Sequence, residues 1–181
     1  MTELRIPTAR LDLVAATLAH VEAELEGADR LAALLGARVP EGWPPGEYDR
    51  SAQEYFRERL AEGGAAVVGW LGWYAVRRAD GAAPALLVGA GGYLGPPSPA
   101  GEVEIGYSLL PEARGRGYAV ELARFLVDRA LAHPGVSRVV AHTDAANAAS
   151  VAVLERAGFR AAGGGAEPGS LRFELSRGSR G

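Results

Sequence analysis

Residues 102–119 form the stretch that decides the fold. They read Glu102-Val103-Glu104-Ile105-Gly106-Tyr107-Ser108-Leu109-Leu110-Pro111, followed by Glu112-Ala113-Arg114-Gly115-Arg116-Gly117-Tyr118-Ala119. This pattern predicts a strand and then a glycine-rich turn that opens directly into a helix. The glycines let the backbone bend with its N–H groups toward one point, and the helix N-terminus adds unpaired donors and a partial positive charge. We therefore expect an anion such as a phosphate group to bind at this turn.

The sequence after this turn predicts a helix followed by a parallel strand. Apolar residues recur at helical spacing over 118–132, and residues 137–143 read as the next strand. Because a helix connects them, this strand should lie parallel to the strand that starts at Glu102, through a right-handed crossover. A ligand then lies at the carboxyl ends of the two strands. A last helix and a hairpin of 159–162 with 171–175 complete this half.

The segment before Glu102 predicts antiparallel strands. Residues 65–76 and 85–93 read as two strands joined near Asp80-Gly81, a strong hairpin signal. With the strand from Glu102 they form an antiparallel meander of three. The aromatic residues within 65–76 are interpreted as packing groups rather than as a ligand cage. They are Trp70, Trp73 and Tyr74.

The N-terminal part predicts a short strand and several helices. Residues 11–15 alternate as a strand that should lie at one side of the sheet. A capping box from Ser51 to Glu54 predicts the start of a later helix. Between these lies the stiff turn 40–46, in which Trp43 is either a packed structural side chain or a wall of an acceptor site.

Composition and charge restrict the class of protein. The chain has 181 residues, 48% hydrophobic and 23% charged, which predicts one globular domain. A net charge of −3 without a concentrated basic face argues against a nucleic-acid partner. Cysteine is absent, which excludes a disulfide and a cysteine nucleophile. With no apolar signal core or membrane-spanning run, we expect a cytoplasmic protein without a membrane partner.

The glycine turn matches neither of two common phosphate-binding motifs. The dinucleotide fingerprint needs three glycines and an acidic residue on the next strand, and the P-loop needs a lysine. Lysine is absent from the whole chain. The turn instead resembles the pyrophosphate-binding motif Gln/Arg-x-x-Gly-x-Gly/Ala of the GNAT superfamily of N-acetyltransferases. The matching positions are Arg114, Gly117 and Ala119, with Gly115 as a frequent extra glycine.

Two further motifs extend this resemblance. Glu104-Ile105-Gly106-Tyr107 precedes the turn, and Asn147-x-x-Ser150 with Gly158-Phe159 follows it. Together they look like the branch that acetylates protein and peptide N-termini, including those of ribosomal proteins. The resemblance implies one domain with three parts, namely a strand and acceptor-side helices in 1–64, the meander in 65–110 and an acetyl-CoA-binding half in 111–181. It also implies that the two parallel strands splay apart around the thioester.

The resemblance assigns acetyl-CoA as co-substrate and requires no metal. The pyrophosphate would take backbone N–H groups of the turn, and the backbone of Leu109 and Leu110 would pair with the pantetheine arm as another strand does. Asn147 would hydrogen-bond the pantetheine, or would cap the helix that follows it. The residues expected to contact the cofactor are Leu109, Leu110, Arg114, Gly115, Arg116, Gly117, Tyr118, Ala119 and Asn147.

The acceptor must attack as a neutral amine, and this favours an α-amine. A lysine side chain is roughly 0.1% neutral at pH 7.4, whereas an α-amino group is roughly 20% neutral. Glu104 is the candidate general base because it shares a strand face with the small residues Gly106 and Ser108. The alternative is that Glu104 is only a solvated or salt-bridged side chain. Glu102, on the same face, is the second candidate.

Ser150 is the local candidate for protonating the departing thiolate. Many family members place a tyrosine seven positions after the asparagine, but this chain has Leu154 there. A thiol with a pKa of about 8.5 also leaves as the thiolate at neutral pH without a strong general acid. The three histidines lack metal-ligand spacing, and His142 is interpreted as a packed or rim side chain.

Two questions remain at this point, namely which amine is the acceptor and whether the chain is an enzyme at all. The acceptor is a protein or peptide N-terminus, or it is a small amine such as an antibiotic, a polyamine or an amino acid. From a different class, the chain is a non-catalytic acetyl-CoA-binding module that senses or scaffolds. A homodimer is common among members of the family, although the sequence identifies no interface.

Overall fold

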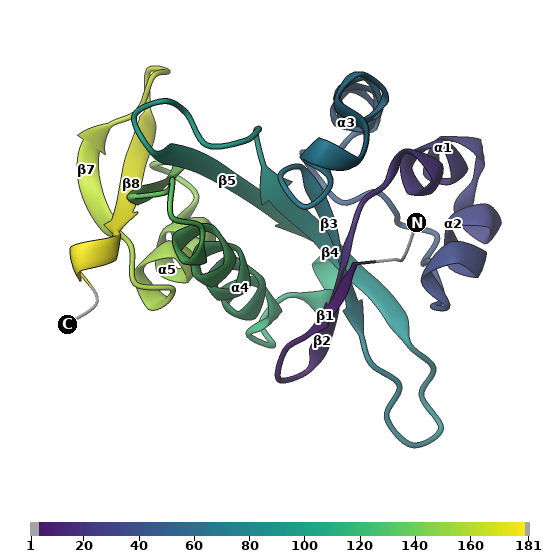
Figure 1. The fold of residues 1–181 in the computed structure, drawn as a ribbon. Helices are drawn as coiled ribbons and strands as arrows, with labels where there is room; N and C mark the ends of the chain where they lie inside the picture. Colours follow the sequence, from purple (N-terminus) through teal and green to yellow (C-terminus); the bar gives the residue numbers. More distant parts are fainter. Residues whose placement is uncertain (1–3, 180–181) are drawn as a thin grey trace.

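A computed structural model describes residues 4–179, which form an α/β fold around one eight-stranded sheet (Figure 1). The strand order is β1-β2-β3-β4-β5-β6-β8-β7, and all neighbours are antiparallel except β5 and β6. The strands are β1 (Arg5–Pro7), β2 (Leu11–Ala15), β3 (Gly72–Arg77), β4 (Leu86–Tyr93), β5 (Glu102–Leu109), β6 (Arg138–Asp144), β7 (Arg160–Gly164) and β8 (Ser170–Ser176). This is the predicted mixed, mostly antiparallel sheet.

Helices cover both faces of the sheet (Figure 1). They are α1 (Leu18–Glu26), α2 (Ala28–Leu35), α3 (Arg50–Gly63), α4 (Tyr118–Ala132) and α5 (Ala148–Arg156). Strand residues alternate between the two faces, so Trp73 packs in the cluster under α4 and its neighbour Tyr74 packs in the cluster under α1 and α2. This alternation confirms that these aromatic side chains are core residues. Within residues 4–179, no helix is long and apolar enough to cross a membrane.

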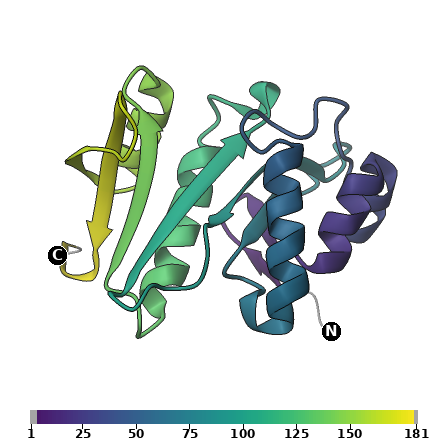
Figure 2. The same cartoon turned by 90° about the horizontal axis from the view of Figure 1, so that it is seen from above.

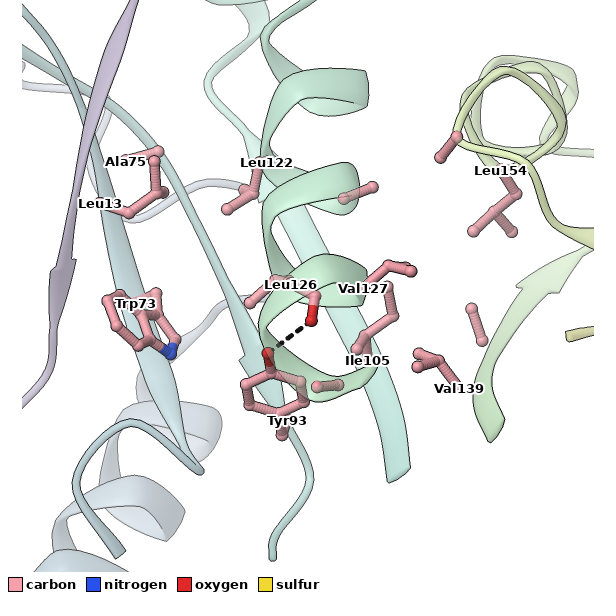
Figure 3. Packing of buried hydrophobic residues seen from close by; sticks show 14 of the residues in the cluster. Leu13, Trp73, Ala75, Tyr93, Ile105, Leu122, Leu126, Val127, Val139 and Leu154 are labelled. Carbon is pink, nitrogen blue, oxygen red and sulfur yellow. Dashed lines mark hydrogen bonds between the residues drawn. The ribbon is translucent and has the colours of Figure 1, made fainter. Parts of the chain in front are cut away.

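Helix α4 supplies the centre of the larger core. Leu122, Leu126 and Val127 are fully buried and face β4, β5 and β6 (Figure 3). Tyr93 on β4 donates its hydroxyl to the carbonyl of Leu126 at 2.6 Å, which satisfies a polar group inside this core. Burying each leucine side chain contributes about 2 kcal/mol to folding, so this helix is held firmly on the sheet.

The parallel strands separate along their length. Their pairing runs only from Glu102 opposite Arg138 to Ile105 opposite Ala141. Beyond this point β5 stays paired with β4, while β6 stays paired with β8. Figure 2 shows the two strands side by side at one end and diverging toward their carboxyl ends. The predicted splay is therefore present, and it opens a gap beside the start of α4.

Two local predictions were wrong and a third was incomplete. The strand expected over 65–76 starts only at Gly72, because 64–67 form a 3₁₀ helix before the chain enters the sheet. Helix α3 is capped by Asp49, which accepts the N–H of Ala52 at 3.1 Å, so Ser51 lies inside the helix. The strand at 11–15 does lie at one side of the sheet, as expected, but it is not the first strand, because the unpredicted short strand β1 precedes it and pairs with its outer side.

Candidate active site

The turn before α4 has the geometry of an anion site. Gly115 and Gly117 have φ values of +71° and +82°, in the left-handed region that favours glycine. Helix α4 begins without a side-chain cap. Within residues 4–179, no protein group accepts a hydrogen bond from the backbone N–H groups of residues 115–120. A helix start with free donors attracts negative charge, and these donors fit a pyrophosphate.

The side chains of the turn leave this backbone site open. Arg114 folds back and donates its Nε to the carbonyl of Leu109 at 3.3 Å, while Arg116 is exposed. Tyr118 is 8% exposed and packs into the core below the turn. Ala119 is small and half-buried at the first turn of the helix. The free donors at the turn are therefore backbone N–H groups, and the side chains of residues 114–119 do not cover them.

The open edge of β5 presents further backbone donors to the gap. The N–H of Leu110 donates to the carbonyl of Val88 on β4 at 3.0 Å. Because N–H groups alternate between the two sides of a strand, Tyr107 and Leu109 direct theirs toward the gap. The carbonyl of Leu110 also accepts the N–H of Ala113. The N–H of Leu109 is therefore directed as the predicted pairing with a pantetheine arm requires. The prediction has to be corrected for Leu110, because its N–H and its carbonyl both form hydrogen bonds within the protein.

Glu104 and His142 meet where the strands begin to separate. A distance of 2.9 Å joins Glu104 Oε1 and His142 Nδ1. Both side chains are partly buried, at 35% and 25% exposure, so neither is a freely solvated surface group. Beyond Glu104 the same strand face carries Gly106, which is exposed, and Ser108, which donates to the carbonyl of Pro45 at 3.2 Å. The loop 40–46 thus contacts the far end of this face at Ser108, and exposed Gly106 lies between that contact and Glu104.

Glu102 has a different environment from Glu104. Its Oε2 lies 3.1 Å from Arg138 Nε and 2.8 Å from Arg172 Nη2. Both guanidinium groups contact the same oxygen of this carboxylate. Glu102 therefore belongs to an ion-pair network between β5, β6 and β8, whereas Glu104 pairs with a histidine at the gap.

Asn147 and Ser150 lie at the start of α5, across the gap from β5. Asn147 is the N-cap residue and accepts the N–H of Ser150 at 3.0 Å, as its alternative interpretation as a cap predicted. Sequence reasoning did not single out Tyr107 as a site residue. Its hydroxyl crosses the gap to Ser150 Oγ at 3.3 Å. Burial raises the pKa of Tyr107 and outweighs the opposing hydrogen bond to Ser150, so the phenol is protonated at neutral pH.

The family model described as acetyltransferase (GNAT) domain matches residues 10–160, which include the turn, the splayed strands and α5. The chain belongs to the GNAT acetyltransferase family. The uncharacterised N-acetyltransferase YjdG of Bacillus subtilis (strain 168) is 34% identical over 125 residues, which cover 69% of this chain and 71% of that relative. The chain is thus an acyltransferase.

Solved structures share the GNAT fold over nearly the whole chain. A proposed ribosomal-protein-serine acetyltransferase from Vibrio cholerae has a TM-score of 0.62 and 19% identity, with coverage of 96% of this chain and 97% of that chain. The aminoglycoside acetyltransferase AAC(6')-Ib in complex with coenzyme A has a TM-score of 0.59 and 18% identity, with coverage of 92% and 95%. At these identities the likeness establishes the fold alone.

A buried carboxylate organises the other side of this GNAT domain and was not predicted. Glu24 on α1 is 8% exposed. Its Oε1 accepts from Trp43 Nε1 at 2.6 Å and Gln53 Nε2 at 3.0 Å, and its Oε2 accepts from the hydroxyls of Tyr74 at 2.7 Å and Tyr48 at 2.9 Å. Burial raises the pKa of Glu24, although the four hydrogen bonds oppose the shift. Four elements therefore meet on one carboxylate.

The Glu24 network decides between the two interpretations of Trp43. The indole packs against Tyr48 and Tyr74 at ring-centroid distances of 5.8 and 6.2 Å, in addition to its bond to Glu24. Trp43 is thus a structural side chain that anchors the loop 40–46. Within residues 4–179, no group of three or more His, Asp or Glu side chains could hold a metal ion.

Proposed function

We propose that this GNAT enzyme transfers the acetyl group of acetyl-CoA directly to a primary amine, and that its acceptor is the α-amine of a protein or peptide N-terminus. The pyrophosphate binds to the backbone donors of residues 115–119, and the pantetheine arm extends along the open edge of β5 at Leu109. The observation that carries the proposal is the position of Glu104, held by His142 at the mouth of the gap that those donors border.

Glu104 is the proposed general base. His142 engages Oε1 of Glu104, which leaves Oε2 for the incoming amine. The amine nitrogen attacks the thioester carbon, its proton passes to the carboxylate directly or through a water, and the carbon–sulfur bond breaks to release CoA. The departing thiolate takes a proton, and we assign its donor to Ser150 and its partner Tyr107, whose hydroxyl groups meet across the gap. Asn147 holds Ser150 in place as the cap of α5.

The acceptor class follows from the ease with which the acceptor itself loses a proton. Glu104, hydrogen-bonded to His142, is the one base in the proposed mechanism. An α-amine is roughly 20% neutral at pH 7.4 and needs little help to lose its proton, whereas a lysine side chain is roughly 0.1% neutral. An α-amine is therefore the acceptor that this arrangement serves best.

The test is thiol release from acetyl-CoA, followed with a colorimetric thiol reagent. The acceptors are N-terminal peptides, lysine-bearing peptides, polyamines and aminoglycosides, and the absence of cysteine from the chain removes any protein background. We expect the fastest release with N-terminal peptides. Release only with another class would replace the acceptor in the proposal, and silence with every acceptor, despite measurable CoA binding, would favour a binding module without catalysis.

Two neighbouring carboxylates provide a matched pair of variants. Glu104→Gln should lower kcat by about 10²–10⁴-fold, the usual contribution of a general base, and leave CoA affinity unchanged. Glu102→Gln alters a carboxylate on the same strand face that is already held by two arginines, so kcat should stay within a few-fold of wild type. Full activity in Glu104→Gln would remove Glu104 from the mechanism.

A further inference from the structure

The turn between β1 and β2, residues 8–10, lies against the start of α4 (Figure 1) and is held there from two sides. Glu121, in the first turn of α4, accepts the hydroxyl of Thr8 at 2.6 Å and the backbone N–H groups of Arg10 at 2.7 Å and Leu11 at 3.2 Å. From the other side, Arg78 donates to the carbonyls of Thr8 at 2.9 Å and Ala9 at 2.6 Å. This turn is therefore rigidly placed.

The Arg10 side chain extends from this turn to the glycine loop. Its Nε donates to Glu121 Oε2 at 2.9 Å and its Nη1 donates to the carbonyl of Arg116 at 2.6 Å. The guanidinium also lies over the ring of Tyr118, 4.7 Å from the ring centre. Although the side chain is 48% exposed, these three contacts fix its plane. A planar guanidinium group that is bonded on two sides keeps one orientation.

The bond to Arg116 controls the direction of a backbone donor. The peptide unit between Arg116 and Gly117 is trans, so its C=O and its N–H point in opposite directions. Since Arg10 holds the carbonyl, the N–H of Gly117 is turned to the opposite side, with the free donors of the helix start. A Cβ built on Gly117 would stand 3.1 Å from Arg10 Nη2, so the side chain also fills the space behind the loop.

We propose that Arg10 is a positioning residue for the pyrophosphate of the co-substrate, which it serves by orienting the loop 115–117 from a turn that lies more than a hundred residues earlier in the chain. The charge of Arg10 is matched by Glu121, so the pair adds orientation rather than net positive charge. Burial alone would raise the pKa of Glu121, but the hydrogen bonds from Thr8, Arg10 and Leu11 outweigh it and hold the pKa below its ordinary value. Glu121 is thus ionised at neutral pH and keeps Arg10 in place.

The inference rests on the proposed function for the identity of the ligand. It predicts that loss of Arg10 affects ligands with a pyrophosphate and spares those without one, whereas a general loss of stability would affect both. A loop that binds pyrophosphate matters only for a ligand that carries one. S-Acetylpantetheine contains the thioester and the pantetheine arm but no pyrophosphate. Loss of Arg10 should therefore weaken the binding of CoA and leave the use of S-acetylpantetheine unaffected.

The first measurement is calorimetric titration of the full chain with CoA, which needs no turnover. Arg10→Gln should weaken CoA binding about tenfold or more, the effect of losing charge-assisted hydrogen bonds. The matched control is Arg124→Gln, since Arg124 on α4 also donates to a backbone carbonyl, that of Arg156 at 2.7 Å, which belongs to α5 and not to the loop. It should bind CoA as wild type does. Equal CoA affinity in Arg10→Gln and wild type would overturn the inference.

Two further readouts separate orientation from charge and from folding. Arg10→Lys keeps the positive charge but cannot hold Glu121 and the Arg116 carbonyl at once. It should therefore bind CoA almost as weakly as Arg10→Gln does. Wild-type CoA affinity in Arg10→Lys would show that charge alone matters. With S-acetylpantetheine as acetyl donor, kcat/KM of Arg10→Gln should stay within about twofold of wild type. An equal loss with both donors would overturn the positioning role. Failure of the wild-type chain to bind CoA would instead remove the proposed function.

Discussion

Substitution of Glu24 by alanine tests how α1, α3 and the loop 40–49 are held on the sheet. The carboxylate accepts hydrogen bonds from Trp43, Tyr48, Gln53 and Tyr74, which come from the loop 40–49, α3 and β3. Alanine leaves these four donors without their acceptor. Because a cavity of about 400 Å³ reaches Glu24, Trp43 and Gln53, water can replace part of the loss.

The expected cost follows from these contacts. A buried donor left unpaired costs about 1–3 kcal/mol, and since water reaches the site we take about 1 kcal/mol for each of the four donors, or about 4 kcal/mol in all. In a domain of this size each kcal/mol lowers Tm by roughly 2–4 °C, so Tm should fall by roughly 8–16 °C. Thermal unfolding followed by circular dichroism, with urea unfolding as a second measurement, would give the value.

The control is Glu26→Ala on the same helix. Glu26 is 54% exposed and pairs with Arg30, an exposed i,i+4 ion pair of the kind that contributes about 0.3–0.5 kcal/mol. Its loss should leave Tm nearly unchanged. A fall of less than about 1 kcal/mol in the unfolding free energy of Glu24→Ala, or equal effects of the two variants, would refute the view that Glu24 holds four elements together.

The charge of Glu24 gives a pH dependence of defined sign. Burial raises its folded-state pKa above the unfolded value, so the folded protein binds more protons than the unfolded chain just above pH 4 to 5. The contribution of Glu24 to stability is therefore complete at low pH and falls as pH rises through its folded pKa. Glu24→Gln cannot ionise, so its stability relative to wild type should increase from pH 4 to pH 7. A constant difference over that range would show that the pKa is not raised.

Two other substitutions test the far side of the gap. Asn147→Ala should lower the unfolding free energy by about 1 kcal/mol, because it removes the side-chain cap of α5, and denaturant unfolding would measure it; an unchanged midpoint would contradict the cap. Tyr107→Phe should lower kcat by about tenfold near pH 7 and by less at pH 9. At pH 9 the leaving thiol, with a pKa of about 8.5, departs as a thiolate and needs little protonation. A pH-independent loss would argue against a role in protonation, and the pH profile of kcat distinguishes the two.

The parts of the fold that sequence predicts best are those fixed by local signals. Helix α4 was expected over 118–132 and runs from Tyr118 to Ala132, because glycines fix its start and an apolar stripe runs along it. The parallel pairing of β5 with β6 followed from the helix between them. The errors arise where two local signals compete. Asp49 and Ser51 are both good cap residues, and only the tertiary position of the loop selects Asp49.

The site contacts that sequence could not give join residues far apart in the chain. Glu104 was predicted as a base from its strand face, but its bond to His142 depends on the register of two strands. Arg10 is more than a hundred residues from the loop that it holds, and no local pattern connects them. Residues 65–71 show the opposite problem, because this segment suits a strand as well as the 3₁₀ helix that residues 64–67 form. Only packing against α3 decides between them.

The measurement that tests the central claim most directly is the location of the acetyl group on a peptide that offers two amines. A peptide with a free α-amine and one internal lysine is incubated with acetyl-CoA and the enzyme, and the product is sequenced by mass spectrometry. Direct transfer from acetyl-CoA to an α-amine, with Glu104 as general base, predicts acetyl on the N-terminal residue and loss of product in Glu104→Gln. Acetyl on the lysine side chain, or an equal yield from Glu104→Gln, would contradict the account.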